Sequence, residues 1–394
     1  MGVPRFPRTA TLVEPPAPPP SIPPLKGEGV ARADNRGALT MTNPAYRRTQ
    51  LESLVEAQGG CRATPPLLLK ADPYFDLAGE EFGRRLLLTT DTSGAEYCLR
   101  PDFTLPIVAD YIAAGTREPA AFSYLGPIFR QRENGPAEFD QAGIELLAQP
   151  DGDIALDQVL TFARAALSLY GIVPQVHLGG VGLFEGLLAQ ADMPDAWRPR
   201  IRHRFGHPEA MDRLLTRLER APESPRSEQP SRDDLLEDVT ARMVSAGLSL
   251  SDGRSPAEIA DRFLEQQALD AAQVPAATLT LLREYLAIKG DALTALRQIE
   301  ALGEKHRLFL GAPIRAIRRH LDSLGDARVS FDASFSPRLD YYTGIVFEMR
   351  GQGGTILVSG GQYDRLLERL GATAPVAASG CALWVDRLEA EWPK

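Results

Sequence analysis

The strand patterns of this chain fall into two groups separated by a long helical stretch, and this order constrains the fold more than any other feature. Short apolar runs bounded by turn residues predict a first group of strands at 85–89, 96–99, 122–125, 144–148 and 176–178. A second group is predicted at 329–331, 345–349 and 355–358. Residues 183–325 between them show helical patterns with little strand signal. The chain is therefore expected to form one α+β domain that is interrupted by a helical insertion, rather than two independent halves.

This interpretation divides the chain at three places. Residues 41–182 and 326–394 are expected to be the two parts of the split core, and 183–325 the helical insertion. Within the core, an amphipathic pattern predicts a helix over 155–170 that ends before Gly171. A last helix is expected over roughly 379–391.

Residues 1–40 differ in composition from the rest of the chain. Nine of the 32 prolines lie between Pro4 and Pro24. Such a segment cannot bury enough apolar surface to offset its ordering entropy, and proline interrupts every apolar stretch that a signal peptide would need. Two interpretations stay open: a disordered arm, or translated upstream sequence with the true start at Met41. We favour the second, because a helix is expected directly after Met41, with Asn43-Pro44 at its start.

Charge and cysteine usage argue against several classes of protein. The formal net charge of −9 does not suit a surface that holds a nucleic-acid backbone. Cys61, Cys98 and Cys381 lie far apart and outside any metal-binding motif, so neither disulfides nor a metal site are indicated. The sequence contains no run of about 18 apolar residues, so no membrane-spanning helix and no membrane partner are expected. We expect a cytoplasmic protein without metal or cofactor.

Four segments carry a more specific signal through their order. Each alone has an ordinary structural explanation, such as a turn, a half-buried strand or a bulge. They are Thr64-Pro65-Pro66-Leu67-Leu68, Leu99-Arg100-Pro101-Asp102-Phe103-Thr104, Tyr124–Arg130 with Phe139–Glu145, and Leu339–Glu348 with Ser359–Asp364 and Ala382–Leu388. Taken in order, with a helical insertion between them, they resemble the class II aminoacyl-tRNA synthetase core, specifically the histidyl-tRNA synthetase family. The resemblance implies an antiparallel sheet flanked by helices, and a homodimer through the motif at Pro65-Pro66.

The resemblance also implies a pocket for free histidine, and the residue types suit the amino-acid end of that ligand. Asp102, helped by Thr104 and the Gln141 amide, would pair with the ammonium group. Arg130 would hold the carboxylate in a bidentate fork. Asp102 stands where the synthetase has Glu, so its contact is expected to be longer or bridged by water.

Three further residues would complete the pocket at the imidazole end. By the same resemblance, Glu145 would accept a hydrogen bond from an imidazole N–H. The phenols of Tyr341 and Tyr342 would close that side of the site.

The parts that activate an amino acid with ATP are altered. Negative charge that develops on ATP during activation needs fixed cations. The synthetase arginine that lies three residues before the Asp-Tyr-Tyr is Pro337 here, and Arg338 would point to the opposite face of an extended segment. The loop 133–138 carries two acids and no base, where the synthetase has a basic loop. Trp384 replaces a small glycine on which adenine would lie.

Two features at the C-terminal end follow the same trend. Arg387 is retained, but we expect it to pair with an acid such as Asp386 or Glu389. The chain ends at Lys394, where the synthetase continues into an anticodon-binding domain, so no tRNA partner is expected.

The family that keeps the histidine pocket and drops these parts is the regulatory subunit of ATP phosphoribosyltransferase. The resemblance implies a protein with no catalytic residues and no activity of its own. It would assemble with the catalytic subunit and let histidine inhibit the first step of histidine biosynthesis. Two alternatives stay open: an active synthetase-like ligase that adenylates histidine, and a structural scaffold that binds no histidine.

Overall fold

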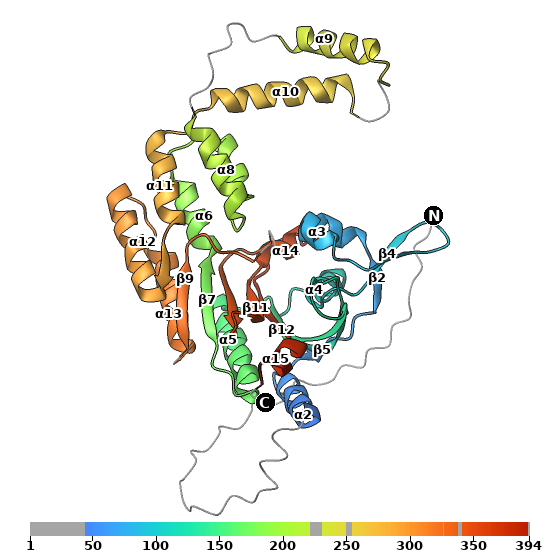
Figure 1. Cartoon of the computed structure of the whole chain (residues 1–394), viewed down its shortest axis with the longest axis vertical. Coiled ribbons are helices and arrows are strands. Elements are labelled where there is room, and N and C mark those ends of the chain that lie inside the picture. The colour runs from blue at the N-terminus through green and yellow to red at the C-terminus, as the bar shows by residue number, and fades with distance from the viewer. Residues whose placement is uncertain (1–43, 221–230, 250–253, 326, 338–340, 393–394) are drawn as a thin grey trace, which may run out of the picture. The chain divides into compact units, whose positions relative to one another are not determined.

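The computed structural model describes residues 44–392, except for 221–230, 250–253, 326 and 338–340. The described residues belong to one compact unit that begins at Pro44. The two interpretations of residues 1–40, and the expected orientation of Arg338, lie outside the described residues. The fold is α+β, with a large sheet flanked by helices (Figure 1), which confirms the predicted fold class.

The central sheet contains strands from both predicted groups. Its nine strands are, in spatial order, β1 (Cys61–Arg62), β5 (Ala120–Phe129), β6 (Glu138–Leu147), β12 (Ala378–Trp384), β11 (Ile356–Gln362), β10 (Ile345–Arg350), β7 (Gln175–Gly180), β9 (Arg328–Asp332) and β8 (Lys289–Asp291). Strands β12, β11 and β10, which follow the insertion in sequence, lie between β6 and β7, which precede it. Within the run from β5 to β7, each strand is antiparallel to the next, whereas β1 and β9 at its two ends pair in parallel. Neither group of strands could therefore form this sheet without the other.

Helix α5 (Gly152–Leu169) covers one face of the sheet. Asp151 caps it by accepting from the backbone N–H groups of Asp153 and Ile154. The helix packs against β12, β11 and β6 through its buried apolar stripe. Each fully buried leucine or valine in such a stripe stabilises the fold by about 1.5–3 kcal/mol. The predicted helix at 155–170 is confirmed, and Gly171 follows it with φ of 64°.

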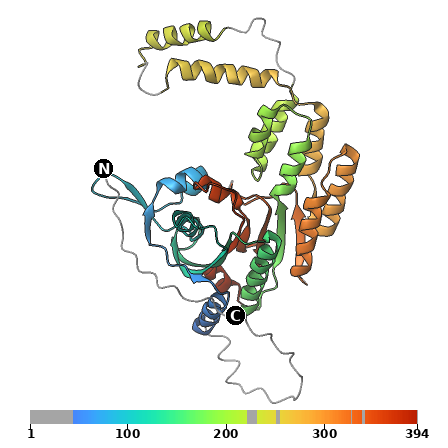
Figure 2. The same ribbon diagram turned by 180° about the vertical axis from the view of Figure 1, so that it is seen from behind.

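The region between the two strand groups is mostly helical. Its helices are α6 (Val181–Gln190), α7 (Arg198–Arg202), α8 (Pro208–Glu219), α9 (Arg232–Ser245), α10 (Pro256–Ala271), α11 (Ala276–Leu286), α12 (Ala292–His306) and α13 (Gly311–Ser323). Strand β8 lies among them in sequence and pairs with β9 at the sheet edge. Figures 1 and 2 show α12 and α13 along this edge from both sides. The insertion is thus joined to the core by strand pairing as well as by helix packing.

A second, three-stranded sheet lies near the start of the core. It consists of β2 (Leu68–Lys70), β4 (Glu96–Leu99) and β3 (Leu88–Thr90). Asp91 stabilises the turn between β3 and β4 by accepting from the backbone N–H groups of Ser93 and Ala95 at 2.8 and 3.0 Å. The hairpin predicted around this turn is confirmed, although its first strand begins later than expected.

The segment 379–391 corrects one prediction, because only its second half is a helix. Residues 378–384 form β12, and α15 begins at Val385 and ends at Glu391. The small residues Ser379, Gly380 and Cys381 are buried between β6 and β11. Hydrogen bonding to strands on both sides therefore outweighs the local helical pattern.

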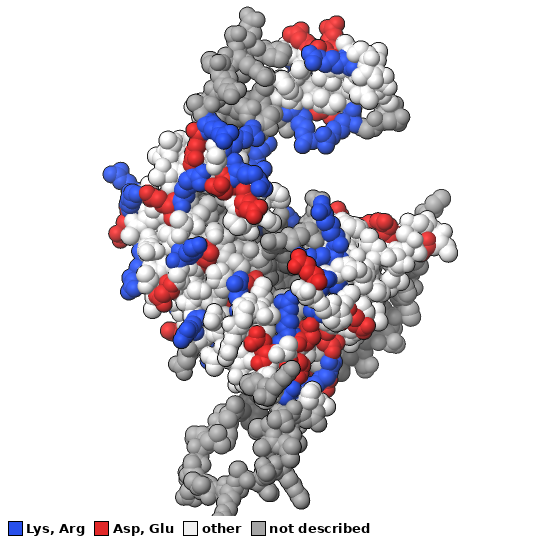
Figure 3. Space-filling view, viewed as in Figure 1, with Lys and Arg blue, Asp and Glu red and all other residues white. Residues whose placement is uncertain are grey.

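The remaining helices are α2 (Pro44–Glu56), α3 (Asp72–Gly83), α4 (Thr104–Ala113) and α14 (Asp364–Arg369). Among the described residues, no helix combines the length and the apolar character that crossing a membrane requires. On the face drawn in Figure 3, Lys and Arg side chains of the described residues are interspersed with Asp and Glu side chains.

Candidate functional site

Strand β6 supplies the base of the candidate site. Because side chains alternate along a strand, Gln141, Gly143 and Glu145 lie on one face of the sheet. Gly380 of β12 lies opposite Glu145. Its neighbour Cys381 contacts the Val159 carbonyl of α5, so α5 covers the other face. The candidate site therefore lies on the face of the sheet that α5 leaves open.

Two glycines leave room for the side chains of this site. A Cβ atom at Gly380 would lie 1.7 Å from Oε2 of Glu145. A Cβ atom at Gly143 would lie 2.3 Å from the phenol oxygen of Tyr124. Both distances are far shorter than any real contact, so the Glu145 and Tyr124 side chains occupy space that any larger residue would fill.

Glu145 is the most heavily hydrogen-bonded acid of the site. Only 1% of it is exposed. Oε1 accepts from the hydroxyls of Thr104 at 2.6 Å and Tyr124 at 3.3 Å, and Oε2 accepts from the hydroxyl of Tyr363. Burial raises the pKa of Glu145 to about 8, although these hydroxyls lower it. The site therefore holds a carboxyl group that binds a proton near neutral pH.

Asp102 and Arg130 form a second, oppositely charged part of the site. Asp102 precedes α4 and accepts from the backbone N–H of Leu105 at 3.1 Å. Burial raises the pKa of Asp102, whereas the Arg130 charge lowers it. Burial lowers the pKa of Arg130 to about 10, and Asp102 opposes this shift. Each charge thus shifts the pKa of the other group, so Asp102 and Arg130 lie near each other where burial limits their hydration.

Tyrosine rings form an aromatic wall beside Glu145. The rings of Tyr341 and Tyr342 are buried, with their centroids 5.3 Å apart. The Tyr363 ring lies edge-on to both, at 6.2 and 6.5 Å. Burial raises the pKa of Tyr341 and Tyr342, and the nearby Glu145 raises it further. The phenols therefore stay protonated and can donate hydrogen bonds into the site.

All seven residues singled out from the sequence lie in this region, but two have local partners already. Thr104 donates its hydroxyl to Glu145. The side-chain oxygen of Gln141 accepts from the backbone N–H of Phe103 at 3.3 Å. These two side chains therefore support the site's framework, whatever they contribute to a ligand.

Sequence reasoning missed three residues of the site. Tyr124 and Tyr363 donate to Glu145, and Gly380 makes room for it. Each of them lies within or beside a recognised motif. The alternation of strand 122–129 opposite strand 138–147 was the signal that could have placed Tyr124 beside the pocket.

Two arginines near the site, Arg132 and Arg387, already have partners within the protein. Arg132, in the loop between β5 and β6, pairs with Asp386 at 2.8 Å, and its guanidinium lies 3.6 Å from the centroid of the Phe139 ring. The Arg387 guanidinium lies 4.9 Å from the centroid of the Trp384 ring.

The expected pairing of Arg387 with Asp386 or Glu389 is wrong. Arg387 donates to the Ile356 carbonyl at 2.7 Å. Asp386 pairs with Arg132, and Glu389 pairs with Arg47 at 2.6 Å. Arginines from distant segments therefore pair with both acids, and Arg387 pairs with neither.

Comparisons with known proteins find a family model and relatives that match most of this chain. The family model described as histidyl-tRNA synthetase matches residues 41–223 and 260–388. A relative from Brucella canis, called ATP phosphoribosyltransferase regulatory subunit, is 36% identical over 369 residues, which cover 89% of this chain and 97% of that one. A relative of the same name from Brucella ovis has the same identity and coverage.

Two solved structures share the fold. One, from Bacillus halodurans, is called an ATP phosphoribosyltransferase regulatory subunit/histidyl-tRNA synthetase. Its TM-score is 0.59 at 22% identity, over 94% of this chain and 83% of that one. The other, a histidine–tRNA ligase subunit from Alicyclobacillus acidocaldarius, has a TM-score of 0.53 at 25% identity, over 93% and 96%. Both fold and sequence thus point to the group of proteins that the motifs resemble.

Proposed function

The chain belongs to the regulatory subunits of ATP phosphoribosyltransferase, which share the histidyl-tRNA synthetase fold, and we propose that its Glu145 pocket binds free histidine as a feedback signal. The observation that carries the proposal is that the opposite charges of Asp102 and Arg130 act on each other, beside the separate, buried carboxyl group of Glu145. A free amino acid presents an ammonium and a carboxylate close together. Adjacent groups of opposite charge complement both ends of that zwitterion.

The imidazole end of histidine would lie at Glu145. Hydroxyls of Thr104, Tyr124 and Tyr363 fix the position of this carboxyl group. A carboxyl with a pKa of about 8 and an imidazole, which ordinarily titrates near 6.5, can share one proton at neutral pH. The pair therefore stays hydrogen-bonded whichever partner holds the proton. This property favours histidine over amino acids with apolar side chains.

The surroundings of the pocket support a regulatory role without adenylation. Adenylation needs cations aimed at the ATP phosphates. Here Arg132 is held by Asp386, and Arg387 stacks on Trp384 and donates to a backbone carbonyl. We propose that the subunit has no catalytic activity alone and acts on a glycosyltransferase, the catalytic ATP phosphoribosyltransferase chain.

The proposed assembly is a hetero-oligomer in which this subunit is also a homodimer through the region of Pro65-Pro66. Leu67 and Leu68 follow this motif and are about half exposed, at 49% and 50%. Apolar side chains that exposed are candidates for burial by a second copy. We further propose a cytoplasmic location and no tRNA partner, in line with three free thiols and a net charge of −9.

Calorimetry and an activity assay test the proposal together. Histidine should bind saturably to the isolated subunit, and histidine should inhibit the complex that forms when the catalytic chain is added. Another amino acid of similar size, such as glutamine, serves as the ligand control. If the subunit binds no histidine, the alternative of a structural scaffold that binds no histidine is favoured.

The main alternative is an active ligase that adenylates histidine. It requires histidine-dependent exchange of pyrophosphate into ATP. We expect no exchange above a control without protein. Measurable exchange that disappears in Glu145→Ala would overturn the non-catalytic part of the proposal.

A further inference from the structure

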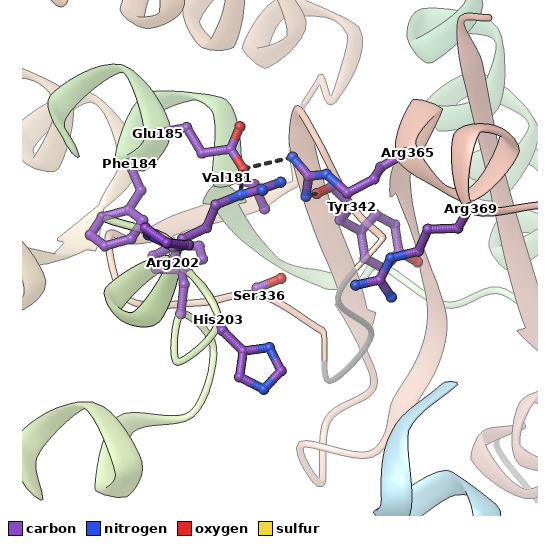
Figure 4. A pocket seen from close by; sticks show the side chains of 11 residues that line it. Val181, Phe184, Glu185, Arg202, His203, Ser336, Tyr342, Arg365 and Arg369 are labelled. Atoms are coloured by element: carbon purple, nitrogen blue, oxygen red, sulfur yellow. Dashed lines mark hydrogen bonds and ion pairs between the residues drawn. The ribbon is translucent and has the colours of Figure 1, made fainter. Parts of the chain in front are cut away.

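A second cavity, of about 210 Å³, lies between the insertion helices and the core. Glu185 of α6 and Arg202 at the end of α7 line one side, and Arg365 and Arg369 of α14 line the other (Figure 4). Tyr342 lines it too, so the cavity borders the proposed histidine pocket. The other six residues of that pocket do not line it, which makes it a separate site.

The charges that line this cavity are unbalanced. Among the described residues that line it, three guanidinium groups, those of Arg202, Arg365 and Arg369, face a single carboxylate, that of Glu185. Oε1 of Glu185 accepts from Arg202 at 2.5 Å and from Arg365 at 2.8 Å. Within the described lining, one carboxylate is therefore shared by two cations, and Arg369 is a third cation. This local gathering of cations contrasts with the net charge of −9 of the chain.

Two of the cations have donor groups to spare. Nη2 of Arg202 is buried and has no hydrogen-bond partner among the described residues. Figure 4 shows Arg369 pointing into the cavity from α14, and within the described part of the chain it forms no ion pair. Buried donors are paired in most native structures, so this Arg202 group has a hydrogen bond still to offer. A ligand with acceptor oxygens would satisfy it.

We propose that this cavity binds a small phosphate-bearing molecule. A phosphate dianion suits a cavity whose described lining carries more guanidinium groups than carboxylates. Its tetrahedral oxygens can also accept from guanidinium groups that approach from different sides, which a single planar carboxylate does less well. Pockets for drug-sized ligands typically enclose about 300–1,000 Å³, so this smaller cavity suits a small ligand rather than a nucleic-acid strand.

Calorimetric titration of the full chain with inorganic phosphate tests the proposal, with chloride at equal ionic strength as the reference. We expect saturable binding of phosphate and none of chloride. Arg369→Gln should weaken phosphate binding on the order of tenfold or more, the effect of losing a hydrogen bond to a charged group. Since Arg369 is exposed and makes no ion pair with the described residues, this variant should fold normally.

Two further variants sharpen the result. Arg202→Gln should also weaken binding at least tenfold, but its loss of the Glu185 pair makes a melting curve necessary as a check. Arg297→Gln, on an exposed position of α12 away from the cavity, should leave phosphate binding unchanged. Absence of saturable binding would overturn the proposal. An equal loss in Arg297→Gln and Arg369→Gln would also overturn it, because that pattern is general charge screening.

Histidine titration of Arg369→Gln separates this proposal from the histidine pocket. Arg369 lies outside that pocket, so histidine affinity should stay as in the wild type. A protein that binds histidine but not phosphate would reject only the phosphate site. A protein that binds phosphate but not histidine would reject only the proposed feedback site.

Discussion

Replacing Glu145 by glutamine should change how the stability of this protein depends on pH. The amide has nearly the same shape as the carboxyl group but does not titrate. The pKa of Glu145 rises from an ordinary value of 4.5 to about 8 on folding. The folded state therefore binds this proton more tightly than the unfolded state does. Stability from this group is fully present below about pH 4.5 and is lost as the pH rises through about 8.

The size of the effect follows from the pKa difference. Between these two pH values, each unit of pH lowers the free energy of unfolding of the wild type by up to about 1.4 kcal/mol relative to Glu145→Gln. Urea unfolding of both proteins, at several values from about pH 5 to about pH 9 and constant ionic strength, measures this difference. Subtracting one curve from the other removes the titration that the two proteins share.

A control variant on the same strand isolates the cause. Glu138 lies at the exposed start of β6, so Glu138→Gln should show no such trend. A wild-type minus Glu145→Gln difference that stays flat, or rises with pH, would refute the reasoning. In that case the hydroxyls of Thr104, Tyr124 and Tyr363 would outweigh burial and keep Glu145 ionised.

Four further outcomes are expected. Glu145→Ala should weaken histidine binding by about 1.5–3 kcal/mol in calorimetry, and histidine inhibition of the assembled complex should weaken by a similar factor. If binding is lost but inhibition is not, the inhibitory site lies elsewhere. Asp102→Asn should weaken binding of any free amino acid that the subunit holds, because it removes the charge opposite the ammonium group; a loss confined to histidine would contradict this role. Light scattering should find a dimer, and a stable monomer at micromolar concentration would count against an interface at Pro65-Pro66. A chain that starts at Met41 should keep its melting temperature and its partner, since the family match begins there; a melting point several degrees lower would show that 1–40 is structural.

Most of the fold followed from local patterns in the sequence. The apolar run at 144–148 predicts a strand, the apolar stripe of 155–170 predicts a helix, and the two strand groups predict a core that is split by an insertion. These features depend on neighbours a few residues apart. They could therefore be derived without knowing which segments meet.

The predictions that failed depend on residues that lie far apart in the sequence. The hydroxyl of Tyr363 reaches Glu145 across 218 residues of sequence, and Glu389 meets Arg47 across 342. Residues 379–384 form a strand because β6 and β11 lie on either side of them. Local sequence does not reveal such distant partners, so the helix expected at 379–384 and the partners expected for Arg387 were both wrong. The motif order singled out residues that lie in one region of the structure, but their hydrogen bonds could be found only from the structure.

The glycines at 143 and 380 make the candidate site an unusual target for mutational scanning. Its shape depends on atoms that are missing, since a single added methyl group would overlap Tyr124 or Glu145. Scans that replace each residue by alanine usually take atoms away, and they are read as losses of contact. At these two positions the same substitution adds a carbon and closes space. Both glycines would thus appear intolerant in such a scan because alanine adds a carbon, whereas Glu145 would appear intolerant because alanine removes its carboxyl group. A chain of this family could lose this site through one added carbon.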